Sequence, residues 1–255
     1  MKRSLQTYPI RTRFAKEIVA EMMFPEKQTG KIIILCSGLP SSPVKNGTLR
    51  FLANQGYVAI YPRYRGTWES DGLFLKYSPY NDIRDIANEI SKKKKVIDLE
   101  SKKGISLQVK KIFVLGVSFG GPSALLASSL PIVSKVVAIS PVVDWKIDSK
   151  TDPFISFVRS TQEQFGMAYR TEKKSDWDKL MQTDFYNPME HIDSCNGKKI
   201  FILHAEDDEI VPIGPSKKFA EKVGGSYYWK RVGGHTLRIH HQFIWKKIET
   251  FLEAK

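Results

Sequence analysis

The sequence predicts an α/β protein in which a mainly parallel central sheet carries helices on both faces. Two observations lead to this prediction. Residues 32–36 form an unbroken apolar run, as a strand that is covered on both faces requires. Segments with strand character then alternate with helical segments along most of the chain. The chain has 255 residues, of which 42% are hydrophobic, so we expect a single domain spanning residues 1–255 with one large core.

The first half of the chain predicts an opening pair of strands followed by regular alternation. Alternating apolar positions over residues 14–24 and a turn from Pro25 to Gly30 indicate the strand pair. Gly56 then separates a short helix from the strand that follows it. The elements expected after the 31–36 strand are a helix at 48–55, a strand at 57–61, a helix capped by Asn81 or Asp82, and a strand starting at Lys110.

The second half continues the alternation on both sides of one long insertion. The expected elements are a helix at 123–129, strands at 133–139, 199–204 and 226–230, and helices at 216–223 and 239–252. Residues 141–197 do not fit this pattern, and we interpret them as a small cap insertion over the carboxyl ends of the strands. Its aromatic residues are candidates for a pocket lining, while most of them are expected to bury the insertion itself: Phe154, Phe157, Phe165, Tyr169, Trp177, Phe185 and Tyr186.

Composition limits the environment and the partners of the protein. Residues 1–13 contain no apolar segment typical of a leader peptide, and no later run reaches the length of a membrane helix. Cys36 and Cys195 lie in different contexts and do not indicate a disulfide. We therefore expect a cytoplasmic protein without membrane contact. The formal net charge of +13 is concentrated in lysine clusters without interleaved aromatic residues, which favours a solvated face over specific nucleic-acid binding.

The segment Gly116-Val117-Ser118-Phe119-Gly120 has the pattern Gly-x-Ser-x-Gly between a predicted strand and a predicted helix. A serine raised on such a sharp turn needs neighbours without bulk, which the two glycines supply. The helix that follows directs its amide groups and positive dipole end toward charge developing beside the hydroxyl. Ser118 is therefore a candidate nucleophile.

A serine hydroxyl needs a base, and the chain offers five histidines. His235 lies in the sequence Gly233-Gly234-His235-Thr236, between the last strand and the last helix, and is the best candidate. His204 ends a strand, where a structural hydrogen-bonding role is more common. The candidates for the acid that orients the base follow the 199–204 strand, and the residues alone leave them open: Glu206, Asp207, Asp208 and Glu209.

These motifs, in the order serine, acid, histidine, resemble an α/β-hydrolase-fold serine hydrolase. The resemblance covers residues 32–252 and is nearest to prolyl oligopeptidase catalytic domains, acylaminoacyl peptidases and small esterases. The pattern Asp-x-x-Val-Pro of that family falls on Asp208, and the resemblance implies that Phe119 and Leu39 supply the oxyanion-hole amides. Residues 64–72 are similar to the family's Arg-Gly-rich segment. Ser37-Gly38 stands where many relatives have His-Gly, and the propeller of true prolyl oligopeptidases is absent from this sequence.

The resemblance implies acyl transfer, and three functions follow from it and from the charge. The first is hydrolysis of carboxylic esters of small or medium acyl groups through an acyl-enzyme. The second is an exopeptidase acting on short peptides, in which Arg63, Arg65 and Glu69 are candidates to bind a substrate terminus. The third is a non-catalytic basic binding protein on a hydrolase scaffold. Metal-ligand spacings and nucleotide motifs are absent from the sequence, so we expect neither a metal nor a cofactor.

Overall fold

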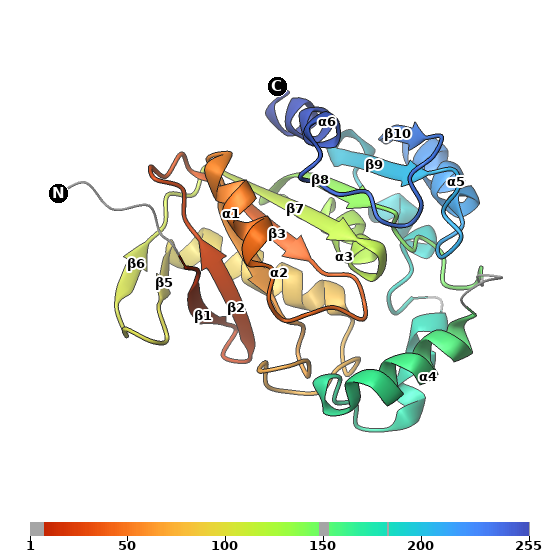
Figure 1. The fold of residues 1–255 in the computed structure, drawn as a ribbon, viewed down its shortest axis with the longest axis horizontal. Helices are drawn as coiled ribbons and strands as arrows, with labels where there is room; N and C mark the ends of the chain where they lie inside the picture. The colour runs from red at the N-terminus through yellow and green to blue at the C-terminus, as the bar shows by residue number, and fades with distance from the viewer. Residues whose placement is uncertain (1–7, 148–152, 183, 255) are drawn as a thin grey trace.

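In the computed structural model, which describes residues 8–147, 153–182 and 184–254, eight strands form one central sheet (Figure 1). The spatial order is β1-β2-β4-β3-β7-β8-β9-β10. β2 pairs antiparallel with β1 and β4, and each later pair is parallel, which confirms the mainly parallel sheet. The strands are β1 (Ile10–Phe14), β2 (Ile18–Met23), β3 (Lys31–Cys36), β4 (Val58–Pro62), β7 (Lys111–Val117), β8 (Val133–Ile139), β9 (Ile200–Ala205) and β10 (Ser226–Lys230).

Helices cover both faces of the sheet, as Figure 1 shows. Apolar residues of α1 and α6 join one face of the strands in one core cluster. Those of α2, α3 and α5 join the other face in a second cluster. This two-sided burial explains why the central strands are apolar throughout rather than alternating. The helices are α1 (Asn46–Asn54), α2 (Pro79–Lys93), α3 (Gly121–Ala127), α4 (Phe154–Phe165), α5 (Ile213–Val223) and α6 (Gln242–Glu253).

Two local expectations differ from the structure. The cap of α2 is Ser78 rather than Asn81 or Asp82, because Pro79 suits the first helical position and the Asp82 carboxylate binds Arg65 instead. The lysine-rich connection after α2 also contains an unexpected hairpin of β5 (Lys95–Ile97) and β6 (Gly104–Ser106). Hydrogen bonds to β1 support this hairpin, since Thr12 donates its hydroxyl proton to the Ile97 carbonyl at 2.8 Å.

Residues 141–197, which we interpret as a cap, connect β8 to β9. Their described part contains α4 and several short 3-10 helices, including one at Lys174–Met181 and one at Pro188–Ser194. In Figure 1, α4 lies beyond the ends toward which the arrows of β3 and β7 point. Trp177 and Tyr186 of this segment are buried in the same core cluster as α2 and α3. The described part of this segment is therefore packed against the layer that contains α2 and α3.

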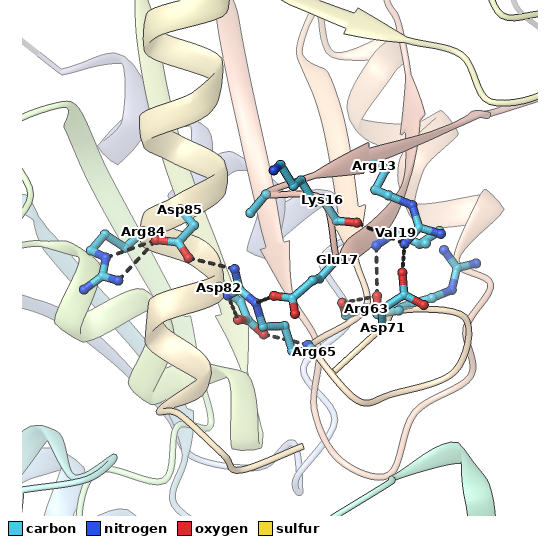
Figure 2. A network of polar contacts seen from close by, with 12 residues as sticks. Arg13, Lys16, Glu17, Val19, Arg63, Arg65, Asp71, Asp82, Arg84 and Asp85 are labelled. Carbon is cyan, nitrogen blue, oxygen red and sulfur yellow. Dashed lines mark hydrogen bonds and ion pairs between the residues drawn. The ribbon is translucent and has the colours of Figure 1, made fainter. Parts of the chain in front are cut away.

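Ion pairs attach the loop after β4 to the elements around it (Figure 2). The Arg65 guanidinium binds Glu17 at 2.6 Å and Asp85 at 2.9 Å, and it also binds Asp82. Glu17 lies in the β1–β2 turn, whereas both aspartates lie on α2. Arg65 thus joins three segments that are distant in the sequence, and holds the loop against the antiparallel end of the sheet.

Candidate active site

Ser118 stands on a sharp turn at the carboxyl end of β7. Its φ of +52° lies in the left-handed region, a strained backbone conformation for a serine. A short 3-10 helix at Ser118–Gly120 leads directly into α3. A Cβ on Gly116 would lie 2.2 Å from the Gly120 carbonyl oxygen, and one on Gly120 would lie 2.2 Å from the Cys36 carbonyl oxygen. The turn therefore requires both glycines, because neither position has room for a side chain, as the sequence motif predicts.

A cavity of about 870 Å³ opens beside Ser118. Its wall includes the ends of β3 and β7, the loop after β3, and part of the segment 141–197. The lining side chains are largely apolar, and of the aromatic residues expected to line a pocket, Phe154 and Phe157 do so. Further apolar residues of the lining are Leu39, Val142, Val143, Trp145, Ile147 and Ile210.

His235 lines the same cavity as Ser118 and binds the carboxylate of Asp208. The His235 Nδ1 atom lies 2.9 Å from Asp208 Oδ2 and 3.2 Å from Oδ1. Because an ionised carboxylate only accepts hydrogen bonds, Nδ1 carries the proton and Nε2 is left with a free lone pair. The structure thus brings Ser118 and His235 to one cavity, and Asp208 binds the Nδ1 atom of the His235 imidazole.

The four acids after β9 have different surroundings. Asp208 is 7% exposed, and its Oδ1 accepts hydrogen bonds from the amides of Ile210 and Val211 at 3.0 and 2.9 Å. Burial by itself would raise the pKa of Asp208, but hydrogen bonds from His204, His235 and Val211 outweigh it and hold the pKa below its ordinary value. Asp207 instead accepts from the amides of Gly233 and Gly234, each at 2.8 Å.

The acid that binds His235 among the four is therefore Asp208, the residue on which the family pattern falls. Glu206 forms an ion pair with Lys217 at 3.0 Å. Asp207 shapes the loop that carries His235 without touching its ring, because its partners are the two glycine amides that precede the histidine. His204 is fully buried and hydrogen-bonded to Asp208 and Ser216, in keeping with the structural role expected from its place in a strand.

The proposed oxyanion-hole residues, Leu39 and Phe119, both line the cavity that contains Ser118. A Cβ on Gly38 would lie 3.5 Å from Ser118 Cβ. The reason is that β3 and β7 are adjacent, with Cys36 paired to Gly116, so the loop after β3 begins beside the turn after β7. The assignment of the Leu39 and Phe119 backbone amides to an oxyanion hole stays a prediction.

Sequence reasoning missed the role of Tyr186, which it named only as one aromatic residue of the insertion. Its hydroxyl donates to the Phe119 carbonyl at 2.8 Å, and the Ser123 hydroxyl lies 2.7 Å away and donates to Tyr186 in turn. All three groups are buried. The only signal in the sequence was position within the insertion, which does not reveal a contact across more than sixty residues.

Arg63, Arg65 and Glu69 do not line the cavity, so the structure does not support them as anchors for a substrate terminus. The Arg63 side chain is 1% exposed and pairs with Glu21 and Glu69, each at 2.8 Å. The guanidinium groups of both arginines are therefore bound in internal ion pairs, which attach the loop to the segments around it.

Other features of the described residues bear on cofactors, redox chemistry and membranes. Cys36 and Cys195 are both free thiols, and burial raises the pKa of the Cys195 thiol to about 11. Within the described ranges, no group of three or more histidine, cysteine or acidic side chains is arranged to hold a metal ion. None of the helices in those ranges has the length and apolar character needed to cross a membrane.

Comparison with known proteins identifies the family. The model of the prolyl oligopeptidase family matches residues 44–227, a range that includes Ser118 and Asp208. The chain belongs to the prolyl oligopeptidase family. It is therefore an enzyme and a serine hydrolase, rather than a non-catalytic binding protein. A search of the curated proteins finds no match.

Solved structures share the α/β-hydrolase fold at low sequence identity. An esterase from Pyrococcus furiosus has a TM-score of 0.69 at 15% identity, with 96% of this chain and 90% of that chain covered. Est1E from Butyrivibrio proteoclasticus has a TM-score of 0.61 at 16% identity, with 97% of each chain covered. The acylaminoacyl peptidase of Pyrococcus horikoshii has a TM-score of 0.60 at 16% identity. It matches 96% of this chain, which spans only 40% of that peptidase.

Proposed function

We propose that this member of the prolyl oligopeptidase family hydrolyses carboxylic esters of small or medium acyl groups. The observation that carries the proposal is the placement of Ser118 and the His235–Asp208 pair at one largely apolar cavity. In this proposal Ser118 is the nucleophile, His235 the general base and acid, and Asp208 the group that orients His235 and stabilises its protonated form.

The reaction proceeds in two acyl-transfer steps. His235 Nε2 accepts the Ser118 hydroxyl proton as the serine oxygen attacks the ester carbonyl, and the Leu39 and Phe119 amides bind the resulting oxyanion. The tetrahedral intermediate collapses, the C–O bond to the alcohol breaks, and His235 returns the proton to the leaving alcohol. Water then attacks the acyl-enzyme with His235 again as base, which releases the carboxylic acid and restores Ser118.

The aromatic part of the cavity lining favours uncharged acyl chains over the amino end of a peptide. The described lining also contains the bases Lys45 and Arg238, which would suit a carboxyl end. An exopeptidase that binds the amino end requires an acid, and the acid found in the described lining is Asp144. Its Oδ1 already accepts hydrogen bonds from Asn187 Nδ2 at 3.0 Å and from the Lys146 amide at 3.1 Å. An uncharged acyl chain instead gains from contact with Phe154 and Phe157. An exopeptidase on short peptides remains the competing hypothesis, because one triad serves both reactions.

Two assays test the proposal in order. Wild-type protein and Ser118→Ala are first treated with a fluorophosphonate probe, and we expect labelling of the wild type alone. Failure to label the wild type, or equal labelling of the variant, would overturn the role of Ser118. Hydrolysis of p-nitrophenyl esters from acetate to octanoate is then compared with that of aminoacyl p-nitroanilides. Higher kcat/KM for the esters supports the proposal, whereas higher kcat/KM for the anilides establishes the exopeptidase.

A further inference from the structure

A second imidazole, that of His204, binds the same Asp208 carboxylate oxygen as His235. His204 is near the end of β9 and is 0% exposed. Its Nε2 atom lies 3.1 Å from Asp208 Oδ2 and 3.0 Å from the Val211 carbonyl oxygen. Its Nδ1 atom lies 3.0 Å from the hydroxyl of Ser216, which is also 0% exposed. Neither His204 nor Ser216 lines the cavity, so neither touches a substrate bound there.

The partners of His204 determine where its proton lies. Nε2 faces two oxygen atoms that only accept hydrogen bonds, a carboxylate and a carbonyl, so Nε2 carries the proton. In a neutral ring, Nδ1 is then an acceptor, and the Ser216 hydroxyl is the donor that satisfies it. Ser216 lies on α5, which starts at Ile213. The first turn of α5 therefore satisfies Nδ1 in the tautomer that Asp208 and the Val211 carbonyl select.

The acceptor positions of Asp208 are fully used by this arrangement. Oδ2 accepts from His204 at 3.1 Å and from His235 at 2.9 Å, while Oδ1 accepts from the Ile210 and Val211 amides. With donors on both oxygens, the carboxylate has one orientation that satisfies all of them. Loss of the His204 donor leaves Oδ2 held by His235 alone, so the carboxylate and the imidazole can turn together.

We propose that His204, whose Nδ1 is satisfied by Ser216, is a positioning residue that holds Asp208 in the orientation which directs His235 toward Ser118. This inference rests on the proposed function, because it explains how two members of the proposed triad, Asp208 and His235, are held in place. A histidine that only fills space in the core would contribute to folding but not to the orientation of His235. The two roles predict different results for variants that keep or remove the donor.

The donor is tested with a matched pair of variants. His204→Gln places an amide N–H near the former Nε2 and keeps the donor to Asp208, whereas His204→Asn keeps a polar group near Ser216 but cannot reach Asp208. We expect His204→Asn to lower kcat on the best ester by roughly 10- to 100-fold, the range seen when a supporting hydrogen bond is removed. We expect KM to change less than about twofold and His204→Gln to recover most of kcat, because substrate binding involves neither residue.

Ser216→Ala and proton NMR extend the test. Removal of the Ser216 hydroxyl leaves His204 Nδ1 without its donor but keeps the Nε2 donor to Asp208, so kcat should fall by less than in His204→Asn, with KM again unchanged. The Nδ1 proton of His235, identified by its loss in Asp208→Asn, should give a low-field resonance that is sharp in the wild type and in His204→Gln. It should broaden in His204→Asn, because a loosened Asp208–His235 pair exchanges that proton with water faster.

The outcomes separate the two proposals. If wild type hydrolyses no ester or anilide and is not labelled, the proposed function fails, and the NMR comparison still decides whether His204 orders the Asp208–His235 pair. If wild type is active but His204→Asn keeps kcat within twofold and its sharp resonance, the positioning role is overturned. Equal losses in His204→Gln and His204→Asn, with matching losses of thermal stability, would also overturn it by showing a role in folding alone.

Discussion

The hydroxyl of Tyr186 donates a hydrogen bond to the carbonyl oxygen of Phe119 at 2.8 Å, which links the insertion to the residue directly after Ser118. Burial raises the pKa of Tyr186 above its ordinary range, so the phenol keeps its proton and stays a donor. The peptide between Phe119 and Gly120 is thereby held by a residue of the insertion. Since the Phe119 amide is a proposed oxyanion donor, this contact bears on the chemistry as well as on the fold.

Tyr186→Phe should lower kcat by roughly two- to tenfold, the effect of one uncharged hydrogen bond of about 0.5–1.5 kcal/mol. The removed hydroxyl leaves the Phe119 carbonyl without its donor, so the turn after Ser118 becomes less rigid. Tyr57→Phe is the matched control, because the Tyr57 hydroxyl donates to Glu253 at 2.7 Å and does not line the cavity. Steady-state kinetics with a p-nitrophenyl ester check both variants, and equal kcat for the two would contradict a role for Tyr186 at the site.

Asp208→Asn should reduce kcat on the order of 10³- to 10⁴-fold, because an amide in that place favours the wrong His235 tautomer and cannot stabilise its protonated form. Asp207→Asn should reduce it less than about tenfold, since an asparagine oxygen still accepts from the Gly233 and Gly234 amides. Both variants change one neighbouring carboxylate to an amide, so each controls for the other. Equal losses, or a larger loss for Asp207→Asn, would move the acid to Asp207.

Gly120→Ala should destabilise the fold by about 1–3 kcal/mol. The added Cβ would lie 2.2 Å from the Cys36 carbonyl oxygen and 2.6 Å from that of Ser37, both of which are backbone atoms. Gly214→Ala in α5 is the control, because a Cβ there meets nothing within 4 Å and alanine favours a helix by roughly 1 kcal/mol. Urea unfolding should therefore shift in opposite directions, and a stable Gly120→Ala would show that β3 and the turn are not in close contact.

Arg65→Met should destabilise the protein by about 3 kcal/mol at pH 8, because it removes the cation that partners the buried Asp82. Arg84→Met should cost about 0–1 kcal/mol, since Arg84 is 41% exposed and pairs with Asp85 at the surface. Urea titrations of both variants and of wild type provide the measurement.

The cost of Arg65→Met should depend on pH in a defined direction. Burial already raises the pKa of Asp82 to about 6 against the opposing effect of Arg65, and loss of Arg65 raises it further. The folded variant therefore binds a proton at a higher pH than the unfolded chain does, so its stability relative to wild type improves as the pH falls from 8 toward 5. A cost that is constant or larger at pH 5 would contradict this assignment.

The fold and the members of the candidate site follow from local patterns in the sequence. Apolar runs identified the buried strands, and the glycines around Ser118 indicated a turn that requires them. The acid was different, because four acidic residues in a row carry no local signal of which one faces a histidine 27 positions later. Only the family pattern selected Asp208, and the reason is visible in its hydrogen bonds with His235.

Long-range polar contacts lay beyond sequence reasoning. Arg63 and Arg65 follow a strand and were candidates to bind a substrate terminus, yet they are neutralised by carboxylates of β2, α2 and the β1–β2 turn and by Glu69 of the same loop. The β5–β6 hairpin was missed for a similar reason, because its short strands are stabilised by hydrogen bonds to β1 rather than by an apolar pattern of their own. Partners of this kind become visible only once the topology is known.

Apart from His235, the groups that orient the acid all come from one short segment of chain. His204, Asp208, Val211 and Ser216 lie between the end of β9 and the first turn of α5, so the loop length between them is part of the geometry. An inserted residue in 205–212 would separate the donors from the carboxylate. Loop grafting in this enzyme should therefore keep 204–216 intact.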